Sequence, residues 1–388
     1  MIPLYLIYCV VCLVIWWCYS GYYIFLWFMS LNAVKPSEKI PADLPDVTIL
    51  IPFYNESAII KNKVKNLASL DYPKDKLDII FLDGCSTDDT CIILSQSISE
   101  YPQMRLVKTG QSGKLNQINY ILPAIKTKLI MNTDADAEIK KEGLLEIAKE
   151  FETYSNAGVV GAMVVPQDCC LEETQYWLTQ NQMRVLESEA YSSSIVIAPC
   201  YVFLNGLIEK FPDDVIADDI YIAFEATLRG KKVVYSKTAI AFELRAPKTA
   251  KQLMIHKFRK TNAYFTEALR FLYHLPKLDV FWRIIYLTRV FQIILQPWFL
   301  LLFLTLTVSF ISFKKYEIIA VIWAFQFFSL IATHTIIRNI EIPIYKEINA
   351  GGNIFQRIKM FVMLTSLLLI AGLAYPFYIQ SGNYKKVN

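Results

Sequence analysis

The stretch "LIMNTDADAEI", residues 129–139, places two carboxylates one residue apart directly behind an apolar run. The apolar residues are typical of a buried strand, so Asp134 and Asp136 stand where that strand ends. Two like charges this close repel each other unless a positive group lies between them. The alternatives are a metal ion that carries a phosphate and an ordinary turn surrounded by solvent.

The chain around this stretch alternates apolar strands with helical segments. Strand-like runs fall within residues 46–56, 77–90, 104–109, 128–136 and 158–166, and helices are expected at 57–70 and 91–98. Such alternation predicts an α/β fold, with a mainly parallel sheet flanked by helices. Ligands of such sheets bind beyond the carboxyl ends of the strands. Asp83, Asp134 and Asp136 all stand at such ends, so we expect them to share one crevice.

The composition is too apolar for an ordinary soluble protein of 388 residues, with 54% hydrophobic and only 19% charged residues. Four runs contain no Asp, Glu, Lys or Arg: residues 1–34, 290–313, 318–337 and 360–384. Each reaches the roughly 20 residues that a helix needs to cross a bilayer. We therefore expect an N-terminal transmembrane helix (1–34), a globular domain (35–245), interfacial amphipathic helices (246–282) and a C-terminal region with about three transmembrane helices (283–388).

The first apolar run is expected to remain as an anchor. Its apolar part is too long for a secretory signal peptide, and neither a basic segment before it nor a small-residue cleavage site after it is present. Most basic flanking residues fall on one side if the globular domain is cytoplasmic, while the pairs 314–315 and 385–386 fall on the other. The basic flanks on the majority side are Lys35, Lys39, Arg283, Arg289, Arg338, Lys346, Arg357 and Lys359. The chain is thus predicted to be a multi-pass protein of the cell membrane.

Charge and cysteine content exclude two further classes of protein. The net charge of +4 is too small and too dispersed to indicate a nucleic-acid partner. The eight cysteines show no paired CxxC spacing, which argues against a zinc site or a disulfide framework.

Asp-X-Asp alone is weak evidence, because acidic residues are common in turns. Mg²⁺ and Mn²⁺ prefer oxygen ligands and are often held by one or two carboxylates together with substrate phosphates. Lys114 lies in the loop "GQSGKLNQIN" (110–119), where a cation at a helix start suits a phosphate, although a solvated lysine is the simpler interpretation. Asp218 and Asp219 precede a helix that ends at Gly230 and is followed by a strand, and they either cap that helix or supply a general base.

Together these segments resemble glycosyltransferase family 2, in the membrane-embedded GT-A branch that includes hyaluronan, chitin and poly-N-acetylglucosamine synthases and ceramide glucosyltransferase. The resemblance covers residues 46–264 and the order of membrane spans. It rests on "IPFYNE", "DGCSTDDT", "GKLNQIN", "DADAE" and "ADDIYIAFEATLRGKKVVY", five motifs in the family's order.

The resemblance implies a role for each motif. Pro52, Tyr54 and Glu56 would belong to the nucleotide-binding strand, Asp83 would contact the base or ribose, and Lys114 would lie near the diphosphate. Asp134 and Asp136 would hold the metal, with Asp136 the direct ligand. Asp219 would be the catalytic base, with Asp218 beside it at the substrate.

One motif departs from the processive members of the family. They carry Q-x-x-R-W, whereas this chain has "HKFRK", with His256, Arg259 and Lys260 at the matching positions. The arginine would act in catalysis, and the other two would contact substrate. Residues 251–275 mix basic and apolar residues as an interfacial helix does, and such a helix could equally be only a membrane anchor. Pro297, inside a predicted span, is expected to kink it.

The expected reaction is an inverting transfer of a sugar from a nucleotide-diphosphate sugar, with Mg²⁺ or Mn²⁺, to a lipid or glycan acceptor at the cytoplasmic membrane face. A processive polysaccharide synthase and a non-catalytic scaffold that binds a sugar nucleotide are the alternatives. A transporter is disfavoured, because the predicted spans lack charged residues at their centres.

Overall fold

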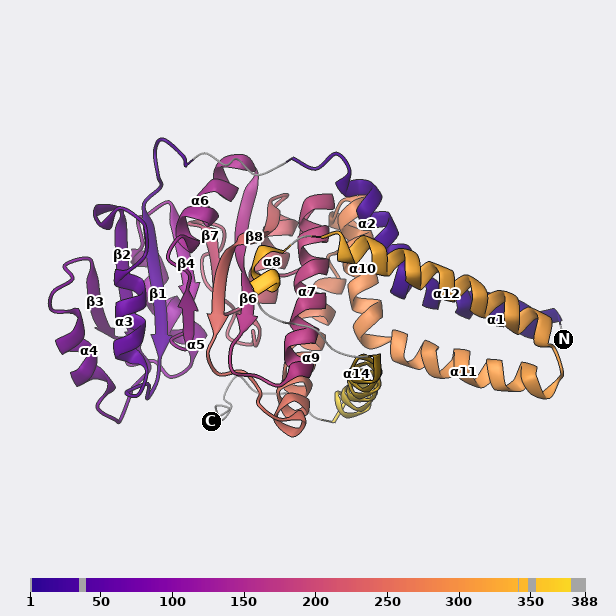
Figure 1. Ribbon diagram of the computed structural model, residues 1–388. Coiled ribbons are helices and arrows are strands. Elements are labelled where there is room, and N and C mark those ends of the chain that lie inside the picture. The colour runs from indigo at the N-terminus through magenta and orange to yellow at the C-terminus, as the bar shows by residue number, and fades with distance from the viewer. Residues whose placement is uncertain (1, 35–39, 341, 348–353, 378–388) are drawn as a thin grey trace.

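The computed structural model describes residues 2–34, 40–340, 342–347 and 354–377. Its α/β domain contains one eight-stranded sheet in the order β3-β2-β1-β4-β7-β6-β8-β5 (Figure 1). The strands are β1 (Val47–Phe53), β2 (Leu77–Asp83), β3 (Met104–Lys108), β4 (Leu129–Thr133), β5 (Ala137–Ile139), β6 (Ala157–Pro166), β7 (Cys200–Leu204) and β8 (Lys232–Glu243).

The two halves of the sheet differ in strand direction. From β3 through β2 and β1 to β4 every pairing is parallel, as the alternation of strands and helices predicts. In the other half β7 runs antiparallel to both β4 and β6, β8 is parallel to β6, and β5 is antiparallel to β8. The α/β prediction is confirmed, but the sequence did not reveal β5 or β7, and the sheet is mixed.

Helices cover both faces of the sheet, which explains why β1 and β6 are buried along their whole length. Alternate residues of β1 enter different cores: Ile49 and Ile51 pack with Val64, whereas Leu50 packs with Ile118. The first face carries α3 (Ile60–Ala68), α4 (Thr90–Ile98) and α6 (Gly143–Thr153). The second carries α5 (Lys114–Ile121), α7 (Leu171–Ala190), α8 (Asp218–Leu228) and α9 (Ala250–Leu272).

The apolar runs form long helices. Residues Pro3–Ser30 are long and apolar enough to cross a membrane, and they comprise α1 (Ile2–Trp16), a π-helical turn (Trp17–Gly21) and α2 (Tyr22–Ser30). The same holds for α12 (Tyr316–Arg338). The helices α10 (Val280–Ile294) and α11 (Gln296–Ser312) meet at a bend of 63° and would together make a third span.

The remaining predicted span is shorter in the described part of the chain. Within α14 (Ile354–Ala374) only Ile358–Ala374 forms an apolar helix, and the predicted run continues beyond the described residues. The bend between α10 and α11 lies just before Pro297, in agreement with the expected kink. A short helix, α13 (Pro343–Glu347), lies between α12 and α14. Lys35, Lys39 and the pair 385–386, which entered the orientation argument, lie outside the described residues.

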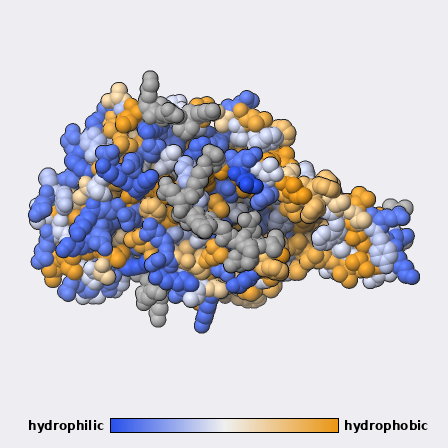
Figure 2. All heavy atoms as spheres, in the orientation of Figure 1, coloured by the Kyte–Doolittle hydropathy of each residue, from blue (hydrophilic) through white to orange (hydrophobic). Residues whose placement is uncertain are grey.

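Helices α1, α11 and α12 extend together away from the sheet (Figure 1). In Figure 2 the hydrophilic colour dominates over the α/β domain, and the hydrophobic colour is more frequent toward these helices. Few polar groups link the three helices: Tyr8 Oη and Thr307 Oγ1 lie 2.9 Å apart, and Gln326 Nε2 donates to the Cys12 carbonyl at 2.9 Å. This arrangement suits a bundle embedded in an apolar medium.

A buried polar cluster, here called the junction cluster, joins the first span to the α/β domain. It consists of Tyr22 in α2, Glu187 in α7, Ser194 after α7 and Arg289 in α10. The Glu187 carboxylate accepts hydrogen bonds from Tyr22 Oη (2.7 Å) and from the Ser194 amide (2.9 Å) and hydroxyl (2.6 Å). Arg289 Nε lies 3.5 Å from the same carboxylate. The cluster therefore fixes the helical bundle to the sheet domain.

Candidate active site

The predicted site residues gather at one edge of the sheet. Because β1, β2 and β4 are parallel and in register, their last residues Phe53, Asp83 and Thr133 end at the same edge. Asp134 and Asp136 follow in the turn between β4 and β5. The helices α5 and α8 begin at this edge with Lys114 and Asp218. The residues that were predicted to share a crevice thus lie together at the carboxyl ends of the strands, where ligands of such sheets bind.

Lys114 lies at the centre of this group. Its Nζ is 2.8 Å from Asp134 Oδ1 and 3.0 Å from Asp218 Oδ2, so one ammonium bridges two motifs that are far apart in the chain. Burial alone would lower the pKa of Lys114, but the two carboxylates outweigh that effect and hold the pKa well above its ordinary value. Lys114 is therefore always charged here, and the interpretation as a solvated surface lysine is wrong.

Asp136 sits between an acidic and a basic neighbour. Burial and the negative charge of Asp134 raise the pKa of Asp136 to about 6. Arg245, just after β8, opposes this shift: its Nη1 lies 3.8 Å from Asp136 Oδ2. The same guanidinium binds Glu56 with both terminal nitrogens, at 3.1 and 2.6 Å. Arg245 thus links the loop after β1 to the turn that carries Asp136.

Asp218 is buried and fully engaged. Its Oδ2 accepts hydrogen bonds from Asn132 Nδ2 at 2.9 Å and from Tyr201 Oη at 2.7 Å, in addition to the Lys114 contact. Ala217 occupies the N-cap position of α8 without a side-chain hydrogen bond, so Asp218 does not cap the helix. The carboxylate instead fixes the orientation of Lys114.

Asp219, the predicted base, has a different environment. It is partly buried and accepts hydrogen bonds from the Ala198 and Ile220 amides, both at 3.0 Å. Burial and the Asp218 charge raise its pKa to about 6, while Lys114 and Lys260 act in the opposite direction. A carboxylate with this pKa is ionised at neutral pH and is a better proton acceptor than an unperturbed aspartate. Its role stays a prediction.

Hydrogen bonds join the loop that follows β1 to the loop that follows β2. The Asn55 amide donates to Ser86 Oγ at 3.0 Å, and the Thr87 amide donates to Asn55 Oδ1 at 2.8 Å. Asp83 is buried at the base of these loops and accepts a hydrogen bond from the Ser86 amide at 3.0 Å. Pro52 is buried within β1, whereas Tyr54 is 46% exposed beside the loops and could stack on a ring.

Helix α9 brings its basic residues to the same region. Lys257 fixes the helix: its Nζ lies 2.9 Å from Glu173 Oε1 and 3.6 Å from the centre of the Tyr176 ring. Lys260 Nζ lies 3.8 Å from Glu243 Oε1, at the end of β8, and its charge acts on Asp219. His256 is buried, and burial together with nearby cations lowers its pKa, so it stays neutral. Arg259 lies on the same helix and is partly exposed.

Sequence reasoning missed several residues at this edge. Arg245 and Lys63 meet Asp136 and the turn around it only through tertiary contacts, and no motif marks them. Asn132 and Tyr201, which position Asp218, could have been found only by pairing β4 with β7. The short apolar run CYVFL at residues 200–204 is consistent with a buried strand, but it does not indicate which strands lie beside it.

The residues present fit a divalent cation only in part. Among the residues that the structure describes, no group of three or more His, Cys, Asp or Glu side chains could hold a metal ion alone. Asp134 and Asp136 nevertheless lie close together, and the negative charge of Asp134 adds to burial in raising the pKa of Asp136. Such a pair suits Mg²⁺ or Mn²⁺ that takes its other ligands from phosphates and water.

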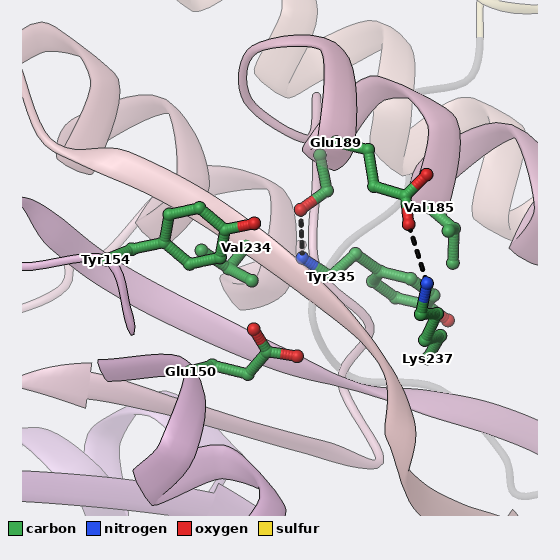
Figure 3. Close-up of a pocket in the computed structure, with 8 residues that line it drawn as sticks. Glu150, Tyr154, Val185, Glu189, Val234, Tyr235 and Lys237 are labelled. Atoms are coloured by element: carbon green, nitrogen blue, oxygen red, sulfur yellow. Dashed lines mark hydrogen bonds and ion pairs between the residues drawn. The ribbon is translucent and has the colours of Figure 1, made fainter. Parts of the chain in front are cut away.

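A separate small cavity lies away from this edge, between α6, α7 and the first half of β8 (Figure 3). The carboxylate of Glu150 points toward it, and the Lys237–Glu189 ion pair at 2.9 Å borders it. Its volume of about 10 Å³ holds about one water molecule, which is far too little for a sugar nucleotide. The cavity is not part of the candidate site.

Comparisons with known proteins agree with the sequence motifs. A family profile described as Glycosyl transferase family 2 matches residues 48–222. The beta-monoglucosyldiacylglycerol synthase of Nostoc is 32% identical over 152 residues, which cover 38% of this chain and 31% of that protein. The poly(ribitol-phosphate) beta-N-acetylglucosaminyltransferase TarS of Staphylococcus aureus is 20% identical over 192 residues, which cover 48% of this chain and 33% of the relative. The chain thus spans about a third of the length of these curated relatives.

The fold has a solved counterpart over nearly its full length. The mannosyltransferase PcManGT from Pyrobaculum calidifontis, solved in complex with GDP-Man and Mn²⁺, superposes with a TM-score of 0.70 at 20% sequence identity. The match covers 96% of this chain and 99% of that one, so it includes the helices that flank the sheet domain. The family 2 profile thus matches residues 48–222, and these residues lie within a domain that has the GT-A-like fold.

Proposed function

We propose that the protein is an inverting glycosyltransferase that moves a sugar from a nucleotide-diphosphate sugar to a lipid or glycan acceptor. The observation that carries this proposal is the convergence of Lys114, Asp134, Asp136 and Asp219 at the carboxyl edge of a family 2 domain. A cation, two metal-binding carboxylates and a tuned base are the groups that an in-line displacement of a diphosphate needs.

The donor would bind along the edge of the sheet. Tyr54, Glu56 and Asp83 lie at the ends of β1 and β2, where the nucleoside would sit with Pro52 beneath it. The diphosphate would reach Lys114, which then exchanges its carboxylate partners for phosphate oxygens. Asp134 and Asp136 would hold Mg²⁺ or Mn²⁺, with Asp136 the direct ligand, and this ion would neutralise charge on the leaving diphosphate.

The acceptor would approach from the side of α8 and α9. Asp219 would remove the proton from its hydroxyl while the oxygen attacks the anomeric carbon, and Arg259 would stabilise the departing diphosphate. His256 and Lys260 would contact the substrate from the same helix. No covalent enzyme intermediate is required.

We extend the proposal to a lipid acceptor and a cytoplasmic catalytic domain. The candidate spans and the junction cluster keep the site close to a bilayer, and one relative is named for a glucosyldiacylglycerol product. We propose a multi-pass protein of the cell membrane, with its transferase domain (35–245) and interfacial helices (246–282) on the cytoplasmic side between an N-terminal span (1–34) and the C-terminal membrane region (283–388). Cys85 is exposed on the α/β domain and would react with a thiol reagent that reaches it. If the domain is cytoplasmic, a membrane-impermeant thiol reagent should fail to label Cys85 in intact cells.

The direct test is transfer by the purified protein. Radiolabelled sugar nucleotides would be supplied in turn with membrane lipids and Mg²⁺ or Mn²⁺, and products would be separated by chain length. We expect one donor to give products with one or a few sugars, and excess chelator to stop the reaction. A long ladder of products would favour a processive synthase, and donor binding without any transfer would favour a scaffold.

A further inference from the structure

A buried lysine lies beneath the turn that carries Asp134 and Asp136. Lys63, in α3, is 3% exposed and points into the domain, unlike Lys61 and Lys65 on the same helix, which are exposed. Its Nζ donates to Thr133 Oγ1 at 2.9 Å and to the Ala137 carbonyl at 2.6 Å. These two acceptors immediately flank the turn, so one ammonium holds both of its ends.

Asn66 makes a second attachment one helical turn later. Its Nδ2 donates to the Ile139 carbonyl at 2.7 Å, and its Oδ1 accepts from the Ile139 amide at 2.9 Å. The strand β5, which contains Ile139, pairs with β8 through Ala137↔Glu243 and its neighbours. The side-chain amide of Asn66 therefore supplies hydrogen bonds to β5 as a neighbouring strand would.

Burying an ammonium at this place is costly. Desolvation lowers the pKa of Lys63 to about 8, although Cys200, Asp134 and Asp136 oppose the shift. An apolar residue facing the sheet from α3 would avoid that cost, as Val64 and Leu67 do. The two hydrogen bonds that Lys63 donates to the ends of the turn offset this desolvation cost.

We propose that Lys63 and Asn66 form a clamp that positions Asp134 and Asp136 for the divalent cation. Both are positioning residues, because they act through the backbone and Thr133 rather than through the substrate. The consequence for turnover rests on the proposed transfer reaction and the consequence for cation affinity rests on the proposed metal site, whereas the consequence for backbone order rests on neither. Reacting groups lose activity when they move by about 1 Å, so a turn held at both ends is worth its cost to a transferase.

The test uses the full-length protein and two measurements. Hydrogen–deuterium exchange reports the opening of the amides of residues 134–139, and titration with Mn²⁺ alone, followed by electron paramagnetic resonance, reports cation affinity. The variants are Asn66→Ala, Lys63→Met and, as the matched control, Lys61→Met, which removes an exposed lysine from the same helix.

In Asn66→Ala and Lys63→Met, we expect the amides of residues 134–139 to exchange at least tenfold faster than in the wild type, while the amides of β1 and β2 exchange at the wild-type rate. In Lys61→Met, all of these amides should exchange at the wild-type rate. Because a loosened turn no longer holds Asp134 and Asp136 in place, the Mn²⁺ affinity of Asn66→Ala should fall by at least threefold. This substitution alters no charge, so the loss would not reflect a change in electrostatics. Lys63→Met also removes a positive charge that repels Mn²⁺. The Mn²⁺ affinity of this variant therefore does not enter the test. If Lys63→Met fails to fold, Asn66→Ala alone decides the exchange measurement.

The clamp is overturned if exchange of residues 134–139 matches that of Lys61→Met in both variants. It is equally overturned if Asn66→Ala exchanges faster but binds Mn²⁺ as well as the wild type, since the contacts would then be structural only. A wild-type protein that transfers no sugar would instead overturn the proposed function, while leaving the exchange and Mn²⁺ results to decide the clamp.

Discussion

Two charged clusters of this protein look alike in composition and differ in accessibility. The active-site cluster of Lys114, Asp134 and Asp218 has side chains that are 26%, 29% and 8% exposed. In the junction cluster, Arg289 is 7% exposed and Glu187 not at all. Both contain a basic group that faces carboxylate oxygens, but only the first is exposed to the extent that the proposed exchange of its partners for a ligand requires.

The difference lies in where the chain places each cluster. Lys114 begins a helix after a loop in which Gly110 and Gly113 adopt positive φ, and its side chain is 26% exposed. Glu187 and Arg289 instead lie inside packed helices, and every oxygen of Glu187 has a donor. Ion pairs at a ligand site must be replaceable, whereas those that join two parts of a molecule must not be.

Asp219→Asn should produce the largest effect on the active-site side of the comparison. The variant keeps the shape of the side chain but cannot accept a proton, and loss of a general base costs about 10²–10⁴ in rate. Turnover would be measured with donor and acceptor at saturation, and donor binding separately. Asp213→Asn, in the exposed segment before α8, is the matched control. Near-normal turnover in a folded Asp219→Asn variant that binds donor would show that the base lies elsewhere.

Glu187→Gln should have the converse effect, on stability rather than on chemistry. Removing one partner of a buried ion pair costs about 3–5 kcal/mol, because Arg289 is left without its counter-charge. Thermal unfolding in detergent should therefore occur at a clearly lower temperature, with Mn²⁺ affinity unchanged. Glu189→Gln on the same helix breaks only the half-exposed pair with Lys237 and should cost below about 1 kcal/mol. Equal stability losses in the two variants would remove the distinction between the clusters.

The parallel half of the sheet was more predictable from the sequence than the mixed half. Asp83, Lys114 and Asp134 were predictable, because each follows a recognisable strand or starts a helix in the all-parallel half, where the carboxyl ends meet at one edge. The charge-free runs likewise predicted long apolar helices that could span a membrane, since the length and polarity of a helix follow from the local sequence.

The mixed half was less predictable for a physical reason. The strand β7 is five residues long and enters the sheet antiparallel between β4 and β6, and nothing in "CYVFL" specifies its neighbours. Asn132 and Tyr201 meet Asp218 only because of that pairing. Lys63, Arg245 and Arg289 resemble surface residues in the sequence, because charged residues are rarely buried. The partners Thr133 and Ala137 of Lys63, Glu56 of Arg245 and Glu187 of Arg289 lie 70 or more residues away in the sequence.

Arg259→Lys should have an intermediate effect and tests whether α9 belongs to the active site or only to the membrane surface. Lysine preserves the charge that attracts anionic headgroups, but it cannot make two parallel hydrogen bonds to a diphosphate. We expect turnover to fall at least tenfold, about 1.4 kcal/mol in barrier, with membrane association unchanged. Lys251→Gln removes an exposed charge from the start of α9 and should leave turnover intact. Wild-type turnover in Arg259→Lys would make membrane anchoring a sufficient role.

Lys260→Met should have the smallest effect, a displaced pH profile. The pKa of Asp219 is about 6, and the Lys260 charge holds it below the value that burial and Asp218 would otherwise impose. If Asp219 must be ionised, kcat/KM rises with pH through this range. Removing the cation makes ionisation harder, so the acidic limb should move to higher pH. The variant should lose about threefold or more at pH 6 and little at pH 8, and Lys260→Arg should restore the wild-type profile. A limb that stays in place, or moves to lower pH, would mean that Lys260 does not act on the base and that the charges of α9 belong with the structural cluster.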